Sequence, residues 1–162
     1  MIDFNFTVIH ALVYAIIFST FTLSTLFINP RLWLHDYPDT IKNIAPSKSE
    51  RENKQTIFLS VLFILIFIGY PIITLFLYKN SITFLGLFLH FFILFQFVNL
   101  IDLLILDWII FCTITPKQII IPGTKVEDGY KNYRFHFIAF LKGIVITTFA
   151  AFVLSGLVIL FI

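Results

Sequence analysis

The sequence predicts an all-α membrane protein, a four-helix transmembrane bundle in one domain over residues 1–162. Apolar residues make up 59% of the chain and charged residues 12%, whereas an ordinary globular domain is about 45–50% apolar. The apolar residues form long continuous runs, not the alternating pattern of a transmembrane β-strand. A small soluble fold leaves too much of its surface in water to bury so much apolar area. We therefore expect helices that cross a lipid bilayer.

Four apolar runs define the expected spans, and about 20 helical residues cross the hydrocarbon of a bilayer. The expected spans cover residues 8–28, 56–78, 82–114 and 137–162. The third run has about 33 residues, or roughly 50 Å of helix, so it must tilt or protrude from the bilayer. The segment before the first span has an acidic residue and no basic one, so we expect this span to be retained instead of being cleaved as a signal peptide.

The basic residues predict the orientation of the bundle. Ten of the 11 Lys and Arg residues lie in or beside the two long connections, residues 29–55 and 115–136, and Lys79 in the short link is the exception. Basic connections tend to stay in the cytosol. We therefore expect both termini outside the cell and both long connections in the cytosol, with chance asymmetry as the alternative.

Two carboxylates interrupt the third span. Asp107 and Asp102 lie about 12 and 20 Å from its cytosolic end. An ionised carboxylate at the centre of a bilayer costs about 2.5–3.5 kcal/mol, so both should face other helices. The spacing of an α-helix predicts that the two side chains point about 140° apart, so we do not expect them to form one dyad.

Each carboxylate has its own expected partners. Lys142 of the fourth span lies at the depth of Asp107, so we expect an ion pair that is either structural or carries protons. Asp102 should be held by hydrogen bonds, and its burial favours the neutral acid. The hydroxyl groups at its depth are those of Ser19, Thr20, Thr147 and Thr148, and Asn99 lies one helical turn away on the same helix. Asp102 then either joins helices or forms a site for a proton or cation.

Polar side chains also crowd the cytosolic boundary. They form either a belt of aromatic and snorkelling basic residues or a pocket for an anionic headgroup. The candidates for binding an anion are Arg31, Lys117, Tyr130, Tyr133 and Arg134. His35 and His136 are candidate catalytic acids or bases at the same boundary. The sequence has no phosphate-binding loop, zinc-protease motif or serine-hydrolase motif, so enzymatic activity stays open.

The sequence gives no reason to expect a metal site, a cofactor or a nucleic acid. Cys112 is the only cysteine, so neither a disulfide nor a cysteine metal cluster forms within one chain. The alternative is haem, held by His10 and His90 within the apolar spans. The net charge of only +2 gives no case for nucleic acid.

Small side chains recur at every fourth position of the last span. This stripe consists of Gly143, Thr147, Ala151 and Ser155. Small residues allow two helices to approach closely. The stripe therefore predicts tight helix packing, either within the chain or between copies in a homo-oligomer.

The run "LDWIIFCTITPKQIIIPGT", followed by "GYKNYRFHFIAFLKG", resembles a group of small bacterial four-span integral membrane proteins. The resemblance covers about 40 residues, from Leu106 to Gly143. It implies the bacterial cytoplasmic (inner) membrane. The group brings no known activity, so the resemblance assigns no site residue.

Three classes of function remain open from the sequence. The first is an interaction, accessory or small-ligand-binding protein whose polar centre at Asp102 and Asp107 opens toward the cytosolic leaflet. The second is a proton- or cation-linked transporter or channel that acts as an oligomer. The third is a membrane-embedded enzyme that acts on a lipid-type headgroup.

Overall fold

The structure is a computed structural model that describes residues 3–77 and 83–161. Within those ranges the chain is helical and has no strand. Four helices are long and apolar enough to cross a membrane, which confirms the prediction of an all-helical chain with four such segments. They are α1 (Phe4–Ile28), α3 (Glu50–Leu77), α4 (Phe84–Ile101) with its continuation η2 (Asp102–Ile114), and α5 (Tyr133–Phe161). The predicted span ends at residues 78, 82 and 162 lie outside the described residues, as does Lys79.

Side-chain caps fix where the long helices begin. The carboxylate of Asp3 accepts a hydrogen bond from the backbone N–H of Phe6 at the start of α1. The hydroxyl of Thr83 accepts one from Gly86 at the start of α4. At the start of α3, Ser49 and Glu52 exchange hydrogen bonds in both directions, which is a capping box. These contacts satisfy N–H groups that the first helical turn leaves without partners.

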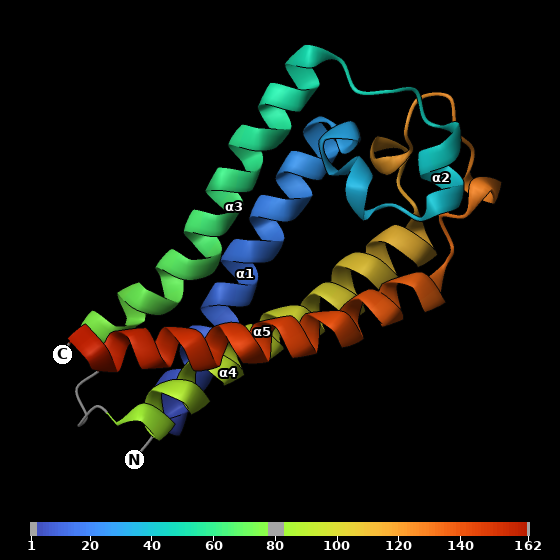
Figure 1. Ribbon diagram of the computed structural model, residues 1–162. Helices are drawn as coiled ribbons and strands as arrows, with labels where there is room; N and C mark the ends of the chain where they lie inside the picture. Colours follow the sequence, from blue (N-terminus) through green and yellow to red (C-terminus); the bar gives the residue numbers. More distant parts are fainter. Residues whose placement is uncertain (1–2, 78–82, 162) are drawn as a thin grey trace.

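The long helices form two arms that diverge from the end where both chain termini lie (Figure 1). One arm contains α4 and α5 side by side, and the other contains α1 and α3. α1 packs against α4 where the arms meet, around the buried side chains of Tyr14, Phe91 and Phe95. The two long connections lie at the opposite end, between the open ends of the arms.

The small-residue stripe of α5 packs within the chain. Thr147, Ala151 and Ser155 are buried, and a Cβ atom at Gly143 would lie 2.5 Å from the side-chain oxygen of Asn99 in α4. The stripe therefore lets α5 lie close to α4. A homo-oligomer through the same residues stays a prediction, and it would require them to leave α4.

The two long connections fold onto each other into a cap, defined here as residues 29–49 and 115–132. The cap contains η1 (Pro30–Asp36), α2 (Asp39–Ile44), η3 (Lys117–Ile119) and η4 (Val126–Asp128). The Tyr37 hydroxyl donates a 2.8 Å hydrogen bond to the carbonyl of Ile119, so one connection is tied to the other. Both side chains are buried in a second apolar core that also includes Cys112.

Candidate functional site

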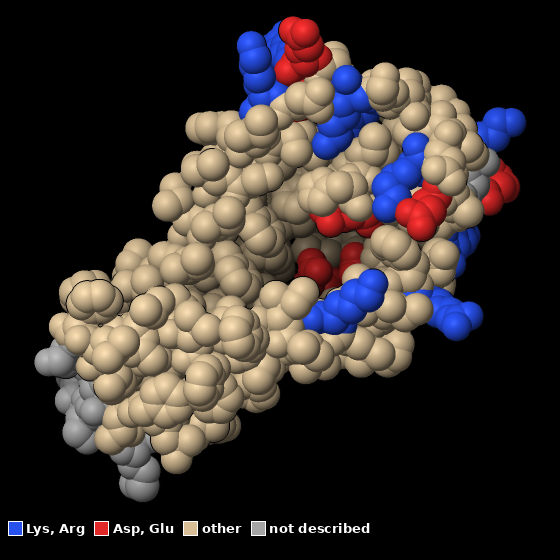
Figure 2. Space-filling view, viewed as in Figure 1, with Lys and Arg blue, Asp and Glu red and all other residues tan. Residues whose placement is uncertain are grey.

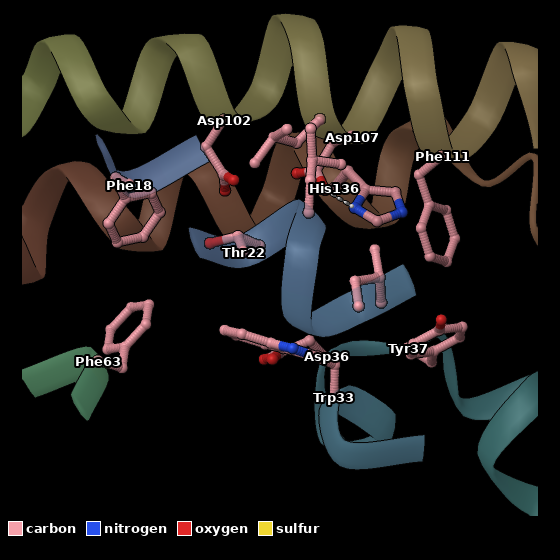
Figure 3. Close-up of a pocket in the computed structure, with 13 residues that line it drawn as sticks. Phe18, Thr22, Trp33, Asp36, Tyr37, Phe63, Asp102, Asp107, Phe111 and His136 are labelled. Carbon is pink, nitrogen blue, oxygen red and sulfur yellow. Dashed lines mark ion pairs between the residues drawn. The ribbon is translucent and has the colours of Figure 1, made fainter. Parts of the chain in front are cut away.

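A cavity of about 200 Å³ lies where the two arms meet the cap. α1, η1, α3, η2 and the start of α5 all contribute to its lining, as the close-up shows (Figure 3). We call this cavity the acidic pocket, because three carboxylates line it. Its side chains with carboxylate, imidazole or threonine hydroxyl groups are those of Thr22, Asp36, Asp102, Asp107 and His136. Among the described residues, neither Lys nor Arg contributes to the lining.

The winding of η2 brings Asp102 and Asp107 to the same cavity, contrary to the α-helical prediction. η2 is a π-helix of 13 residues, in which hydrogen bonds connect residues five apart. At its end the N–H of Thr115 donates to the carbonyl of Ile110, five residues back, over 2.9 Å. In a π-helix, two residues that are five positions apart lie on nearly the same face, and Asp102 and Asp107 have this spacing. The predicted separation of the two carboxylates is therefore wrong, because it assumed an α-helix.

Asp107 is paired with a histidine in α5. Its Oδ1 atom lies 2.9 Å from Nδ1 of His136, whose side chain is only 5% exposed. Because a carboxylate only accepts hydrogen bonds, this contact requires the imidazole proton on Nδ1. The expected partner, Lys142, is exposed on α5. Equal depth in the bilayer does not fix which face of a helix a residue occupies, so the predicted ion pair is not the one formed.

Asp102 lines the acidic pocket, and none of the described residues forms a hydrogen bond or ion pair with its carboxylate. Three of the five expected partners, Asn99, Thr147 and Thr148, are engaged elsewhere, and Ser19 and Thr20 line a different surface pocket. The amide of Gln96 donates to the hydroxyls of Thr147 and Thr148, and the amide of Asn99 donates to the carbonyl of Phe140. Gln96 joins α4 to α5 and was missed, although an amide within an apolar run is itself a signal for such a contact.

Two further polar atoms of the pocket are buried without a partner among the described residues. They are Nε2 of His136 and Oγ1 of Thr22. In Figure 3, Thr22 lies next to the carboxylate of Asp102, and His136 lies between Asp107 and Phe111. Buried polar atoms are nearly always hydrogen-bonded in folded proteins. Both atoms are buried in the pocket lining, so an occupant forms hydrogen bonds with them once their side chains turn toward the cavity.

Aromatic rings, with Leu23, Leu26 and Leu106, supply the remaining walls of the pocket. Phe18 and Phe63 meet edge to face at a centroid distance of 5.1 Å, and Trp33 meets Phe63 in the same way at 6.0 Å. Tyr37 and Phe111 make a third such contact at 5.0 Å, toward the cap. The sequence did not place Trp33 in a site, because it comes from a long connection that folds back onto the helices.

Asp36 stands at the exposed side of the pocket. Its side chain is 57% exposed and lies 3.0 Å from Nε2 of His35, which is also exposed. The space-filling view shows acidic atoms in a hollow between the arms, with Lys or Arg atoms at its rim and around the cap (Figure 2). His35, a predicted catalytic residue, does not line the acidic pocket, whereas His136 does.

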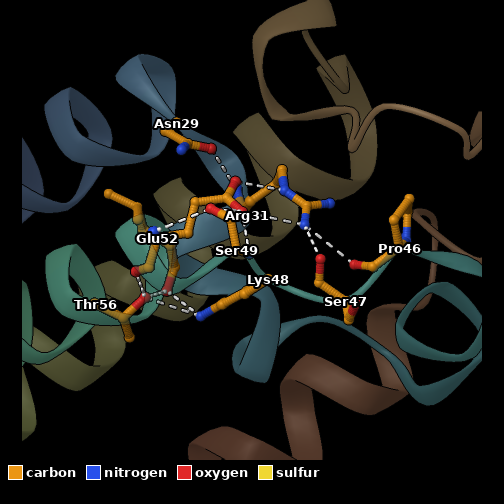
Figure 4. A network of polar contacts seen from close by, with 9 residues as sticks. Asn29, Arg31, Pro46, Ser47, Lys48, Ser49, Glu52 and Thr56 are labelled. Atoms are coloured by element: carbon orange, nitrogen blue, oxygen red, sulfur yellow. Dashed lines mark hydrogen bonds and ion pairs between the residues drawn. The ribbon is translucent and has the colours of Figure 1, made fainter.

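The predicted anion-binding rim is not gathered into one site. Arg31 binds Glu52 through Nε at 2.6 Å and donates to the carbonyls of Pro46 and Ser47, so it fastens the cap to α3 (Figure 4). Tyr130 is fully buried and its hydroxyl accepts from Ile121. The other three predicted residues, Lys117, Tyr133 and Arg134, are exposed.

Burial in the cap shifts two pKa values. Burial, with smaller effects from Tyr130 and Asp36, raises the pKa of Tyr37, so its hydroxyl keeps the proton that it donates to Ile119. Burial also lowers the pKa of Lys48, whose Nζ donates to the carbonyl of Leu32 over 3.0 Å. Both groups act as donors inside the cap and hold it together.

The two histidines of the haem alternative are engaged with hydroxyl groups. His90 is buried, and its two ring nitrogens contact Thr7 at 2.9 Å and Thr74 at 2.8 Å. Nδ1 of His10 contacts the hydroxyl of Tyr70. A haem on these histidines would displace the contacts. Among the described residues, no group of three His, Cys, Asp or Glu side chains could hold a metal ion.

No known family model, curated protein or solved structure matches this chain. The resemblance to small bacterial four-span proteins therefore stays a prediction. Asp102 offers an acceptor or a counter-charge, and the Asp107–His136 pair can exchange a proton with an occupant.

Proposed function

We propose that the chain is a multi-pass membrane protein that binds a small ligand in the acidic pocket. The observation that carries this proposal is the carboxylate of Asp102. Asp102 belongs to a helix that is long and apolar enough to cross a membrane, and its carboxylate lines the cavity. It has no hydrogen-bond or ion-pair partner among the described residues. An ionisable side chain in such a helix is costly, so it is retained chiefly where it has a function.

The pocket has the properties of a site for a small molecule. Such sites are concave, mostly apolar and supplied with a few polar groups that orient the ligand. The volume of about 200 Å³ is below the roughly 300–1,000 Å³ of sites for drug-sized molecules. The ligand is therefore smaller than those molecules.

The basic residues support an orientation with the cap in the cytosol of a bacterial cell. Both long connections are rich in Lys and Arg, and basic connections tend to remain on the cytosolic side. The acidic pocket, which adjoins the cap, would then open toward the cytosolic leaflet of the inner membrane. Both chain termini would lie outside.

Ligand-induced stabilisation of the whole protein in detergent tests the proposal. Cys112 is fully buried and is the only cysteine, so a fluorogenic thiol reagent reports unfolding. Three probes share a phenylethyl body and differ in their end group: 2-phenylethylammonium, 3-phenylpropionate and 2-phenylethanol. We expect at least one of them to raise the unfolding temperature, because a ligand stabilises the state that it binds.

Two matched variants assign any stabilisation to the pocket. Thr22→Phe places a ring in the cavity and should abolish the effect. Ser24→Phe adds the same ring at an exposed position of α1 and should leave the effect intact. The proposal fails if no probe stabilises the unmodified chain, or if the stabilisation survives in Thr22→Phe.

Cation- or proton-linked transport is a second candidate function, favoured by one arrangement. A layer of stacked aromatic rings, with Phe67 4.7 Å from Phe95 and 6.1 Å from Phe63, separates the acidic pocket from a second polar cluster around His90. In channels, an apolar constriction between polar sites gates the passage of ions. In sealed vesicles, Asp102→Asn should abolish the proton flux of the unmodified chain, and an unchanged flux would exclude this candidate.

A further inference from the structure

We infer that the occupant of the acidic pocket is a small organic ammonium ion with an apolar body. The inference rests on the proposed function and names the class of ligand. It is carried by three features of the pocket: its charge, its aromatic walls and its unpartnered polar atoms.

The charge of the lining favours a cation. Three carboxylates and one imidazole line the cavity, and none of the lining residues that the structure describes is Lys or Arg. Even with His136 protonated, the ionised site has two more negative than positive charges. His136 lies against Asp107, so Asp102 has no counter-charge of its own. A bound cation supplies that counter-charge where water cannot solvate the carboxylate fully.

The aromatic walls favour an organic cation. The ring of Phe63 contacts those of Phe18 and Trp33 at one end of the pocket, and Tyr37 and Phe111 close the other end. Aromatic faces attract ammonium groups through the ring quadrupole, and tryptophan does so most strongly. The same rings offer apolar contact to the body of the ligand. A metal ion would instead need several ligand atoms converging on one point, an arrangement that the described residues lack.

The unpartnered atoms favour an ammonium group that carries N–H donors. With its proton on Nδ1 toward Asp107, neutral His136 presents a lone pair at Nε2, which has no partner within residues 3–77 and 83–161. The hydroxyl oxygen of Thr22 is also an available acceptor. The carboxylate of Asp102 accepts hydrogen bonds as well. The pocket thus presents acceptors without cationic donors, which is the complement of an alkylammonium ion.

Titration of the three phenylethyl probes, followed through the unfolding temperature, tests the class of ligand. We expect 2-phenylethylammonium to bind at least tenfold more tightly than 3-phenylpropionate and 2-phenylethanol. Asp102→Asn should weaken this binding at least tenfold. The matched variant Asp39→Asn, an exposed acid of α2 that pairs with Lys42, should change it less than twofold. The inference is overturned if either other probe binds as tightly, or if Asp102→Asn binds normally.

The outcomes separate this inference from the proposed function. If 3-phenylpropionate or 2-phenylethanol binds best and Thr22→Phe abolishes its effect, the pocket binds ligands of another class and only the inference fails. If none of the probes stabilises the protein, both fail.

A covalent probe provides a second test that keeps all three carboxylates. In a Cys112→Ser background, Thr22→Cys is treated with a cationic trimethylammonium-ethyl thiosulfonate and with its anionic sulfonatoethyl counterpart. For each variant, the rate of modification by the cationic reagent is divided by the rate with the anionic reagent. This ratio should be at least tenfold larger for Thr22→Cys than for the exposed control Asn43→Cys. Equal ratios at the two positions would overturn the inference even if Asp102→Asn fails to fold.

Discussion

Replacing Arg31 with methionine should loosen the cap. The guanidinium of Arg31 reaches both carboxylate oxygens of Glu52, at 2.6 and 3.3 Å, and donates to the carbonyls of Ser47 and Pro46. One side chain therefore ties η1, the segment before α3 and the first turn of α3 together. Methionine retains much of the apolar stem but removes every one of these hydrogen bonds and leaves Glu52 without its cation.

The expected cost lies between that of a surface ion pair and that of a buried one. Exposed pairs contribute about 0–1 kcal/mol, whereas breaking a buried pair costs about 3–5 kcal/mol. The side chains of Arg31 and Glu52 are 13% and 16% exposed. We therefore expect a loss of about 2.8 kcal/mol, which corresponds to about a hundredfold change in an equilibrium constant.

The reactivity of Cys112 measures this loss directly. Cys112 lies in the apolar core of the cap, fully buried beside residues such as Tyr37 and Ile41, so a thiol reagent reaches it only when the cap opens. When opening is fast relative to labelling, the labelling rate follows the equilibrium population of the open form. We expect Arg31→Met to raise the rate about a hundredfold.

Arg51→Met is the matched control. Arg51 is exposed in the first turn of α3, so its replacement should change the rate less than threefold. A rate for Arg31→Met within threefold of the unmodified chain would refute the reasoning. It would mean that the contacts of Arg31 do not hold the cap closed.

Two further predictions concern glycines and use the same labelling of Cys112 together with thermal unfolding. Gly143→Ala should cost about 1–3 kcal/mol, because the added Cβ meets the side chain of Asn99 at 2.5 Å. Gly156→Ala, which meets nothing within 4 Å, should be neutral or stabilising, and equal effects of the two would contradict the close packing. Gly129→Ala should cost about 1–3 kcal/mol, because φ is +127° and the new Cβ would collide with Thr40. Unchanged unfolding would show that this turn relaxes freely.

The number of long apolar helices and the separation of the long connections from the termini were predictable from the sequence. Both depend on the length and composition of apolar runs, and a helix needs no partner to satisfy its backbone in lipid. The capping residues, such as Ser49 with Glu52, likewise carry a local signal. Such local signals do not depend on contacts with distant parts of the chain.

The candidate site was predictable only in part. Asp102 and Asp107 stand out because carboxylates are rare in apolar runs, but their common cavity depends on the five-residue spacing of η2. Nothing in the sequence pattern distinguishes this spacing from that of an α-helix. The pairing of Asp107 with His136, and the return of Asp36 from a long connection, depend on contacts between distant segments. Depth in a bilayer restricts such contacts but does not determine them.

The π-helical winding of η2 and the positions of its charges depend on each other. If the same 13 residues rewound as an α-helix, the two carboxylates would point about 140° apart. At least one would then turn away from the cavity, toward a neighbouring helix or toward hydrocarbon. The free-energy cost of placing a carboxylate in hydrocarbon thus favours the π-helical winding of this segment over the α-helical one. A residue inserted between the two acids would change this balance more than many substitutions within the walls of the pocket.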